Sequence, residues 1–518
     1  MKPGGGARLR FAAPMAAFYV TTPIFYVNAA PHLGHAYTTI AADVMARHHR
    51  QRGEDVFFLT GTDEHGEPVA DAARAQGLEP RELADRNAER FKALLPDLHA
   101  SNDFFVRTSD PEHVRRVQEV LQRVHDNGYV YKGTYEGWYC PRCADFKVEN
   151  EIAEGNRCPI HEIELTREAE ENWFFALSRF QEQLERLYEE QPRFVQPDAR
   201  RNEALSFIRG GLNDVSLSRS KLTWGVPVPW DEGHVFYVWF DALLNYVTAL
   251  GFAREDEDLT DRFWPASVHL IGKDILKFHC VFWPAMLLAA GIELPRQVFV
   301  HGFLLGADGR KMSKSLGNVL DPFAVMERFG VDALRFYLLR DVPFGGDGAT
   351  SPAAVQARYE GELANELGNL ASRSLAMVRR YRDGAVPQVA PDAGIAADFD
   401  GLAEDVARRV DDVDLTGALE AVWRSVRRLN RFVEETAPWA LAKQGDDERL
   451  DAVLATLVEG VRTLGVLLHP WLPESTGKLL AALGDERTTY DAASFGAGEV
   501  REVGALDPLF PKREAAPA

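Results

Sequence analysis

Apolar segments of two kinds alternate at the start of the chain. Positions 18–22 and 56–60 are short, rich in apolar residues and bounded by polar or glycine-containing stretches, as is typical of buried strands. Positions 32–51, which lie between them, carry apolar residues at helical spacing. A strand, a helix and a second buried strand form a βαβ unit, so we predict a parallel, doubly wound sheet of the Rossmann type. Further helices are predicted at 83–98 and 111–127.

The pattern changes near residue 131. From there to about residue 233 the chain carries aromatic, β-rich segments such as YVYKGTYEGWYC. The alternating pattern then returns, with strands predicted at 268–271 and 297–300 and a helix at 275–290. The sheet domain is therefore predicted to be split in two by an insertion.

A helical region follows from about residue 353, where glycine and proline are largely confined to loops, and it predicts an α-helical bundle. Positions after 485 give weak signals. The predicted fold class is α/β, a Rossmann-type parallel sheet split by an insertion and followed by the bundle. We divide the chain into an extension at 1–16, the first half of the sheet domain at 17–130, the insertion at 131–233, the second half at 234–300, a loop region at 301–352 and the helical domain at 353–518.

Composition places the chain among ordinary globular proteins. It has 518 residues, of which 46% are hydrophobic and 26% charged. No stretch approaches the ~20 apolar residues of a membrane helix, so no membrane partner is expected. The first sixteen residues are glycine-rich without a long apolar centre, which predicts a disordered extension and not a signal peptide; Met15 offers an alternative start. We expect a cytoplasmic protein.

The net charge of −20 disfavours nucleic acid on average. Binding of RNA would therefore depend on local basic patches, because salt screens charges beyond about 8 Å. The alternative is that these arginines are solvated residues on helix surfaces. The candidates are Arg373, Arg379, Arg380, Arg382, Arg424, Arg427, Arg428 and Arg431.

Three of the four cysteines lie close together in the predicted insertion. Cys140 and Cys143 form a CxxC pair, and Cys158 and His161 form a CxxH pair fourteen residues further on. Three cysteines and one histidine give Zn²⁺ a closed tetrahedral shell, so we predict one structural Zn²⁺ in a knuckle. Incidental thiols are the alternative. Cys280 lies in an apolar run and is interpreted as a core residue.

Two short motifs carry phosphate-binding chemistry. His32 and His35, separated by Leu33 and Gly34, stand at the predicted start of a helix, where backbone N–H groups face an anion. Being three residues apart, the two imidazoles point the same way. Gly34 removes a side chain where a nucleotide approaches the backbone. On its own, such a histidine pair more often packs in the core or binds a metal ion than binds phosphate.

The second motif is Lys-Met-Ser-Lys-Ser at 311–315, in a loop after several turn-forming residues. Lys311 and Lys314 would close on the β- and γ-phosphates of a nucleotide while negative charge builds up. Such stabilisation is worth about 3 kcal/mol for one well-placed donor. The two motifs in this order are much more specific than either alone. Their four charged or imidazole side chains, His32, His35, Lys311 and Lys314, are the predicted catalytic residues.

From about residue 18 to residue 440 the chain resembles the bacterial methionyl-tRNA synthetases, class I aminoacyl-tRNA synthetases. The resemblance is carried by TTPIFYVNAAPHLGH, by GTDEHG at 61–66, by the Lys-Met-Ser-Lys-Ser motif and by the one-metal knuckle. It implies a ligase that activates L-methionine with Mg²⁺-ATP and transfers it to the 3′ end of tRNA(Met), for initiation and elongation of protein synthesis. It also implies that 301–352 holds the catalytic loop and a stem-contact region, and that 353–518 binds the anticodon.

Site residues are carried over from the family motif by motif. Asp63 is expected to hold the substrate ammonium group. ATP is expected to contact His32, Gly34, His35, Gly272, Asp274, Lys311 and Lys314. The methionine pocket is expected to comprise Ile24, Tyr26, Asp63, Val238, Trp239, Ala242, Tyr246, Ile275, Phe278, His279 and Trp283. Ordinary core packing is the alternative for each aromatic residue. Leu243 stands where some family members carry proline.

A polar stripe in the helical domain gives an anticodon-binding hypothesis. Asn365, Asn369 and Arg373 recur every four residues and would line one helix face, opposite Leu363, Leu367 and Leu370. Side chains of this kind bond base edges in single-stranded RNA, and Trp439 would stack on a base. In the family these positions recognise the CAU anticodon. A solvated helix face is the alternative.

Three rival functions were weighed. A synthetase for leucine, isoleucine or valine would carry a larger editing insertion, and a cysteine enzyme would need a cysteine near His32. A tRNA-free nucleotidylyltransferase would lack the long helical domain. A catalytically inactive tRNA-binding relative is disfavoured because both phosphate motifs are intact. The chain ends at Ala518 without the additional oligonucleotide-binding domain that makes some relatives dimers, so a monomer is expected.

Overall fold

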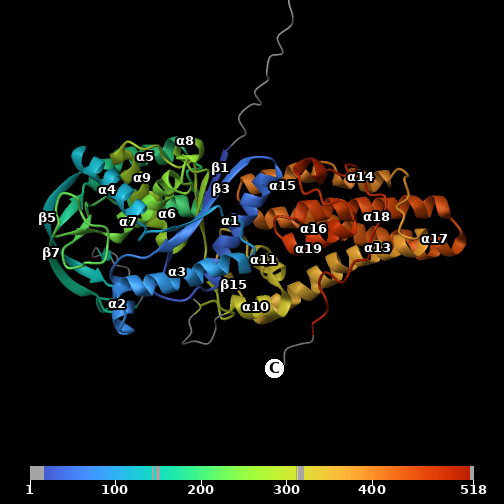
Figure 1. The fold of residues 1–518 in the computed structure, drawn as a ribbon, viewed down its shortest axis with the longest axis horizontal. Coiled ribbons are helices and arrows are strands. Elements are labelled where there is room, and N and C mark those ends of the chain that lie inside the picture. The colour runs from blue at the N-terminus through green and yellow to red at the C-terminus, as the bar shows by residue number, and fades with distance from the viewer. Residues whose placement is uncertain are drawn as a thin grey trace, which may run out of the picture.

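The computed structural model describes residues 17–142, 145–147, 152–160, 162–310, 312 and 320–513. The extension expected at 1–16 lies outside this part of the chain. The sheet and the insertion occupy one half of the molecule and the helical domain the other (Figure 1). Within the described residues, no helix is long and apolar enough to cross a membrane.

Seven strands of the described chain form one sheet, and every pairing in it is parallel. β1 lies between β3 and β12, and β13 and β8 continue the sheet beyond β12. Phe58 and Val268 pair with Val20 from its two sides. The strands are β1 (Ala17–Thr21), β2 (Phe25–Tyr26), β3 (Asp55–Asp63), β4 (Phe104–Arg107), β8 (Val195–Gln196), β12 (Val268–Gly272) and β13 (Val298–His301). This confirms the predicted parallel sheet.

Helices cover both faces of the sheet, as their apolar stripes require. The predicted βαβ unit is β1, α1 and β3, and the helices predicted at 83–98 and 111–127 are α3 and α4. The helices packed on or beside the sheet are α1 (Leu33–Gln51), α2 (Glu67–Ala75), α3 (Pro80–Asp97), α4 (Pro111–Asp126), α7 (Val238–Thr248), α8 (Thr260–Phe263) and α9 (Trp283–Ala290). The α2 helix and the strand β4 were not predicted.

The single helix predicted at 275–290 is wrong in detail. A 3₁₀ turn, η4 (Lys273–Ile275), and a π-helix, η5 (Phe278–Phe282), precede α9. Pro284 has no N–H group, so the carbonyl of Cys280 loses its α-helical donor. The hydroxyl of Tyr188 donates to that carbonyl instead, at 2.7 Å.

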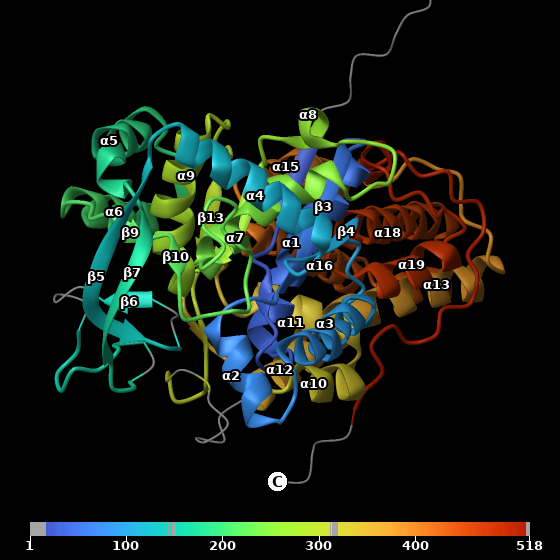
Figure 2. The same ribbon diagram turned by 60° about the vertical axis from the view of Figure 1, so that its left-hand side comes forward.

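The insertion is built on a long antiparallel hairpin. β5 (Val130–Cys140) pairs along its length with β7 (Thr166–Phe175), and β6 (Asp145–Lys147) and β9 (Val215–Ser216) flank them. Figure 2 shows this hairpin at the edge of the molecule away from α13 and α18. The sequence did not predict that two helices and a strand of the main sheet also lie within 131–233. They are α5 (Gln181–Glu190), α6 (Asp198–Arg209) and β8.

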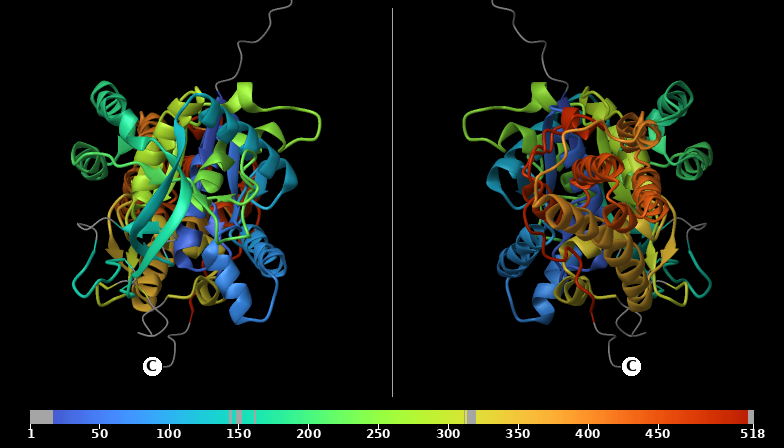
Figure 3. Two further views of the ribbon diagram at one scale, coloured as in Figure 1. Left: turned by 90° about the vertical axis from the view of Figure 1, so that its left-hand side faces the viewer. Right: turned by 90° about the vertical axis from the view of Figure 1, so that its right-hand side faces the viewer.

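The helical domain begins near α12 and packs into a bundle, as predicted. The end-on views of Figure 3 place the hairpin at one end of the molecule and the bundle at the other. From α10 onward the helices are α10 (Pro322–Phe329), α11 (Val331–Arg340), α12 (Pro352–Arg358), the π-helix η7 (Tyr359–Gly368), α13 (Asn369–Arg382), α14 (Ala393–Phe399), α15 (Leu402–Asp411), α16 (Leu415–Thr436), α17 (Pro438–Gln444), α18 (Asp447–Leu468), α19 (Pro473–Ala482) and the 3₁₀ turn η8 (Tyr490–Ala493). The short remaining elements are η2 (Leu177–Phe180), β10 (Ser218–Arg219), β11 (Val235–Phe236), η3 (Ala249–Gly251), β14 (Leu304–Leu305) and β15 (Gly348–Ala349).

The core is continuous between the sheet and the bundle. One cluster of buried apolar residues runs from Phe18 and Ile40 through Phe336 to Trp423 and Leu464. It therefore spans β1, α1, α11, α16 and α18. The two halves of the molecule thus share buried surface and are not joined by a linker alone.

A buried ion pair crosses this shared core. Arg335 on α11 and Asp43 on α1 both have fully buried side chains, and Arg335 donates to the Asp43 carboxylate at 2.7 Å. Arg335 also donates to the carbonyls of Leu98, Pro470 and Trp471 at 2.7–2.9 Å. Burial alone would raise the pKa of Asp43, but Arg335 and Arg47 lower it below its usual value. The guanidinium therefore has four acceptors, from three parts of the chain.

We expect Arg335→Met to lower the free energy of unfolding by about 3–5 kcal/mol, because Asp43 would keep a buried charge without its main partner. Urea denaturation followed by tryptophan fluorescence measures this loss. The matched control is Lys478→Met, which removes an exposed pair with Glu474 and should change stability by no more than about 0.5 kcal/mol. Equal losses in the two variants would contradict the assigned role of Arg335.

Candidate active site

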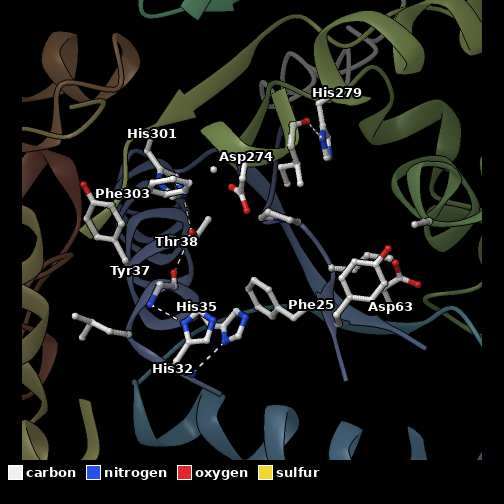
Figure 4. A pocket seen from close by; sticks show the side chains of 18 of the residues that line it. Phe25, His32, His35, Tyr37, Thr38, Asp63, Asp274, His279, His301 and Phe303 are labelled. Atoms are coloured by element: carbon white, nitrogen blue, oxygen red, sulfur yellow. Dashed lines mark hydrogen bonds between the residues drawn. The ribbon is translucent and has the colours of Figure 1, made fainter. Parts of the chain in front are cut away.

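A cavity of about 500 Å³ opens at the carboxyl ends of the parallel strands. This is where ligands bind in open α/β sheets. Its wall combines the N-terminus of α1, the ends of β2, β3 and β12, one face of α7 and the segment 301–304 (Figure 4). Of the predicted residues, the cavity is lined by Ile24, Tyr26, His32, Gly34, His35, Asp63, Trp239, Ala242, Tyr246, Gly272, Asp274, Ile275 and His279.

The two histidines of the first motif are oriented by the backbone at the start of α1. The N–H of Gly34 donates to Nδ1 of His32, and the N–H of His32 donates to Nδ1 of His35, both at 3.1 Å. The rings stack with centroids 3.7 Å apart. Because a backbone N–H only donates, each Nδ1 is an acceptor and each neutral ring carries its proton on Nε2. The N–H donor of both rings is therefore Nε2.

Burial lowers the pKa of His35 well below its usual value, and the nearby His32 adds to this shift. His35 is therefore a neutral hydrogen-bond donor at physiological pH. The structure gives a second reason for glycine at position 34. A Cβ at this position would lie 3.1 Å from Cε1 of His32, so glycine also makes room for the capping ring.

Lys311 and Lys314 lie outside the described residues. Met312, between them, lines the cavity, and its sulfur accepts from the backbone N–H of Leu320 at 3.5 Å. The Lys-Met-Ser-Lys-Ser segment therefore passes beside the cavity at this one described position.

Asp63 ends β3 and faces the same cavity. Its side chain is buried, and in the described part of the chain its Oδ1 atom has no hydrogen-bond partner. Burial raises the pKa of Asp63 well above its usual value, and the carboxylates of Asp241 and Glu64 raise it further. A buried acceptor without a partner is costly, so the site fits a ligand that brings a positive donor.

Tyr246 and His279 form a fixed pair at the apolar end of the cavity. Nδ1 of His279 lies 3.1 Å from the carbonyl of Ile275, and Nε2 lies 2.8 Å from the Tyr246 hydroxyl. Burial lowers the pKa of His279 to about 4, so the ring is neutral near pH 7. Since the carbonyl can only accept, Nδ1 carries the proton and the Tyr246 hydroxyl donates to Nε2. The end of the cavity is therefore uncharged, and it suits an apolar side chain.

Three residues predicted for the methionine pocket do not line this cavity. Phe278 stacks on Trp239 with centroids 3.9 Å apart, and Trp283 packs against Tyr246 at 5.8 Å. Val238 faces the backbone of Gly66, where a Cβ would lie 3.2 Å from it. Phe278 and Trp283 therefore lie behind the wall and support lining residues, whereas Val238 contacts Gly66, which does not line this cavity.

One wall of the cavity, made by Thr38 and His301, was not predicted from the sequence. The ring of His301 donates from Nδ1 to the carbonyl of Gly302 at 2.9 Å, and its Nε2 lies 2.8 Å from the Thr38 hydroxyl. Burial lowers the pKa of His301. Tyr37, Phe303 and Leu304 complete this wall. His301 could have been identified from its position, because it directly follows a predicted strand whose carboxyl end lies beside Gly272.

The predicted anticodon residues lie on η7, α13 and α17. Asn365 on η7 and Asn369 on α13 are exposed, while Leu363, Leu367 and Leu370 are buried, as the spacing predicts. The guanidinium of Arg373 lies 5.8 Å from the ring centroid of Trp439, whose side chain is 46% exposed. The structure therefore brings residues from two separate helices, α13 and α17, together.

Most of the candidate arginine patches are neutralised by acidic neighbours. Arg382 pairs with Asp447 and Asp451, and Arg428 pairs with Asp398 and Glu435. Further pairs involve Arg373 with Glu434, Arg424 with Asp405, and Arg427 with Glu362, Glu366 and Glu420. These arginines are thus engaged within the protein and are weak evidence for an RNA-binding surface.

The predicted zinc ligands are described only in part. Cys140 and Cys158 are fully buried and pack in one small cluster with Leu165. Cys143 and His161 lie outside the described residues, and among those that are described no three potential ligands come together. The structure therefore places two of the four predicted ligands, Cys140 and Cys158, in one buried cluster.

Comparison with known proteins assigns the chain to a family. A family model for class I tRNA synthetases (M) matches residues 18–169 and 148–375. Methionine-tRNA ligase of Streptomyces coelicolor is 46% identical over 97% of this chain and 98% of its own length, and that of Caldanaerobacter subterraneus is 45% identical over 92% and 76%.

Solved structures agree. Mycobacterium tuberculosis methionyl-tRNA synthetase in complex with methionyl-adenylate matches with a TM-score of 0.90 and 44% identity, covering 96% of this chain and all of that one. The apo form of that enzyme matches with a TM-score of 0.83 and 41% identity, over 97% and 99%. The chain thus matches these enzymes along nearly its whole sequence, and it has a cavity at the sheet edge with this pair of histidines and this buried aspartate. The chain belongs to the class I tRNA synthetases (M).

Proposed function

We propose that this chain is a methionine-tRNA ligase, which activates L-methionine with ATP to methionyl-adenylate and transfers it to the 3′ end of tRNA(Met). The observation that carries the proposal is that one cavity joins the Asp63 carboxylate, whose Oδ1 atom has no partner among the described residues, to two imidazoles oriented by the backbone. An amino acid and a nucleotide would each find a complementary group there. The relatives, which carry the name of this ligase, favour methionine over the rival amino acids and over a tRNA-free transferase.

In the first step, a carboxylate oxygen of methionine attacks the α-phosphorus of ATP. The bond from that phosphorus to the oxygen bridging the β-phosphate breaks, and pyrophosphate leaves with that oxygen. His32 and His35 would donate from Nε2 to phosphate oxygens, and Lys311 and Lys314 would add positive charge as pyrophosphate develops. Mg²⁺ would enter with ATP and neutralise part of its charge. Gly272 and Asp274, at the end of β12, would hold the ribose.

In the second step, the 2′-hydroxyl of the terminal adenosine of tRNA attacks the carbonyl carbon of the adenylate. The bond from that carbon to the phosphate oxygen breaks, and AMP leaves. Asp63 would keep the ammonium group of methionine fixed through both steps. Holding the reactants in register supplies much of the rate.

Selection of methionine would come from the neutral end of the cavity. Contacts between a thioether and aromatic rings such as those of Tyr26 and Trp239 add about 0.3–1.5 kcal/mol. Tyr246 and His279 already satisfy one another, so this end offers little to a charged or strongly polar side chain. A pocket of this kind discriminates weakly against a side chain that lacks one methyl group, so homocysteine should also be activated.

The test is ATP–pyrophosphate exchange with each amino acid in turn. We expect exchange with methionine, and we expect Asp63→Asn to raise KM for methionine by about 10- to 150-fold, since it removes a charge-assisted hydrogen bond. Because the pKa of Asp63 is raised, methionine binding should be strong above this pKa and weaken as the pH falls through it. The control is Asp71→Asn, an exposed residue of α2 paired with Arg74. Exchange driven by leucine, or without any amino acid, would refute the proposal.

The exposed face of η7, α13 and α17 is proposed to bind the anticodon. Asn365 and Asn369 would bond base edges, and Trp439, with Arg373 beside its ring, would stack on a base. The clustering of an exposed indole with a guanidinium at 5.8 Å supports this assignment.

We expect Trp439→Ala to lower kcat/KM for tRNA charging by about 5- to 150-fold, the loss of one stacked base, with no effect on pyrophosphate exchange. The matched control is Phe207→Ala, another exposed aromatic residue on the insertion. Equal charging by the Trp439 variant and the parent protein would exclude this surface as the reader.

One structural Zn²⁺ is proposed to bind Cys140, Cys143, Cys158 and His161. The burial of Cys140 and Cys158 in one cluster supports it, because thiolates are otherwise costly in an apolar interior. The metal would hold the knuckle at the end of the β5–β7 hairpin and would take no part in the chemistry.

Metal analysis should find one zinc ion per chain. Cys158→Ser should remove it and lower the melting temperature, whereas Cys280→Ala, which alters another buried thiol, should leave the zinc content unchanged. A protein purified without chelators that holds no zinc, and is no less stable in the Cys158 variant, would rule the site out.

We also propose a division of labour along the chain. Residues 17–130 and 234–300 would form the catalytic domain, 131–233 the connective insertion, 301–352 the catalytic loop and stem-contact region, and 353–518 the anticodon-binding domain. The protein would act as a monomer in the cytoplasm, where its tRNA substrate is found.

A further inference from the structure

The turn that follows β3 is held by a residue of the insertion. Trp224 lies between β10 and β11, 160 positions after Glu64. Its indole Nε1–H donates to the carbonyl of Glu64 at 2.5 Å, and its own carbonyl accepts from the N–H of Gly66 at 3.2 Å. One residue thus satisfies a backbone acceptor and a backbone donor on the two sides of His65. We call residues 64–66 the β3 turn.

The indole of Trp224 is itself fixed by its neighbours. It meets the ring of His65 at an edge, with centroids 5.2 Å apart, and the guanidinium of Arg81 lies 5.6 Å from its centroid. It also packs against a small buried cluster that contains Phe25 and Val69. The apolar body of the indole is therefore anchored, and its N–H group is directed at one backbone carbonyl.

A second contact from the insertion lies directly after the β3 turn. The hydroxyl of Tyr139, on β5, donates to Oε2 of Glu67 at 2.7 Å, and Glu67 is the first residue of α2. On the other side of the turn, the hydroxyl of Thr108 after β4 accepts from the N–H of Glu64 at 2.9 Å. The β3 turn therefore lies between the sheet and the insertion, and both contribute hydrogen bonds to it.

Asp63 is the residue immediately before this turn, and it lines the cavity. Its carbonyl accepts from the N–H of Val27 at 3.3 Å, which ties it to the end of β2. Beyond Asp63, the chain bends at Gly66, whose φ of 94° is a conformation that glycine adopts readily. Trp224 bonds the backbone at this bend and at Glu64, so it fixes the path of the chain that leaves Asp63.

We propose that Trp224 is a positioning residue for methionine binding, because it holds the β3 turn in the conformation that directs the Asp63 carboxylate into the cavity. The inference rests on the proposed role of Asp63 in binding the substrate ammonium group. Trp224 is not among the described residues that line the cavity, so it acts through Asp63 and does not touch the substrate. The insertion thus contributes to recognition of the amino acid.

The test begins with Trp224→Phe, which removes the indole N–H group and keeps an aromatic ring beside His65. We expect KM for methionine in pyrophosphate exchange to rise about 3- to 10-fold, the loss of one hydrogen bond that holds the binding conformation, while KM for ATP changes by less than about twofold. The matched control is Trp173→Phe, which removes another partly buried indole bond within the insertion, to Asp231 at 3.0 Å. The control should leave both KM values unchanged.

A double-mutant cycle with Asp63→Asn separates positioning of Asp63 from a general loosening of the fold. If Trp224 acts through Asp63, adding Trp224→Phe to Asp63→Asn should raise KM for methionine by less than about twofold more. Full additivity of the two substitutions would overturn the inference. So would an unchanged KM for methionine in Trp224→Phe, or an equal rise in KM for ATP.

If Trp224→Phe does not fold, the indole of Trp224 is replaced with a benzothiophene, which keeps the bicyclic shape but has no N–H group. The expected and contradicting outcomes are then the same. Absence of methionine-dependent exchange in the parent protein would instead refute the proposed function.

Discussion

A single guanidinium fixes the catalytic sheet against the helical domain. Arg335 donates to Asp43 on α1, to the end of α3 at Leu98 and to the turn between α18 and α19. A planar group with five donors suits such a site, because it satisfies several carbonyls whose partners would otherwise be missing. The same α1 helix begins with His32 and His35. The helix that begins with these two imidazoles is therefore anchored, near its middle, to the domain proposed to read tRNA.

Within the active site, backbone groups decide what the side chains can do. Amides at the start of α1 take up Nδ1 of both histidines, and the carbonyl of Ile275 takes up Nδ1 of His279. The first arrangement puts the proton of each ring on Nε2, and the second makes Nε2 of His279 the acceptor for Tyr246. Residues of one type thus have opposite roles at the two ends of one cavity. Local backbone geometry sets this difference, which a list of conserved residue types would not reveal.

Much of the fold could be predicted from the sequence because its signals are local. Strands at 18–22 and 268–271 and helices at 32–51 and 111–127 follow from periodicity, and the structure has them within a few residues. Strand β8 could not be found in this way, since two residues carry no period and its pairing with β13 is a tertiary contact. The helix predicted at 275–290 differs in detail because Pro284 removes one backbone N–H donor and a π-helix precedes α9. The effect of Pro284 depends on a distant tyrosine hydroxyl.

Site residues that belong to a sequence motif could be predicted. Residues that reach the site only through tertiary contacts were harder to predict. His32, His35 and Asp63 meet in one cavity as the motifs implied, whereas Phe278 and Trp283 proved to be one layer too deep. No spacing rule distinguishes a lining aromatic residue from one that supports it. His301 and Thr38 belong to no motif, and only their positions at a strand end and on α1 bring them to the cavity. The hydrogen bonds of Trp224 to the β3 turn likewise join segments far apart in the sequence.

The π-helix η5 has a consequence for how the pocket could change over evolutionary time. A π-turn holds one more residue than an α-turn, and each residue of an α-helix turns the chain by about 100°. Deleting a single residue between 278 and 282 would allow regular α-helical winding, but would swing His279 away from Tyr246 without altering either side chain. The contact between His279 and Tyr246 thus depends on the length of this segment as well as on the two side chains.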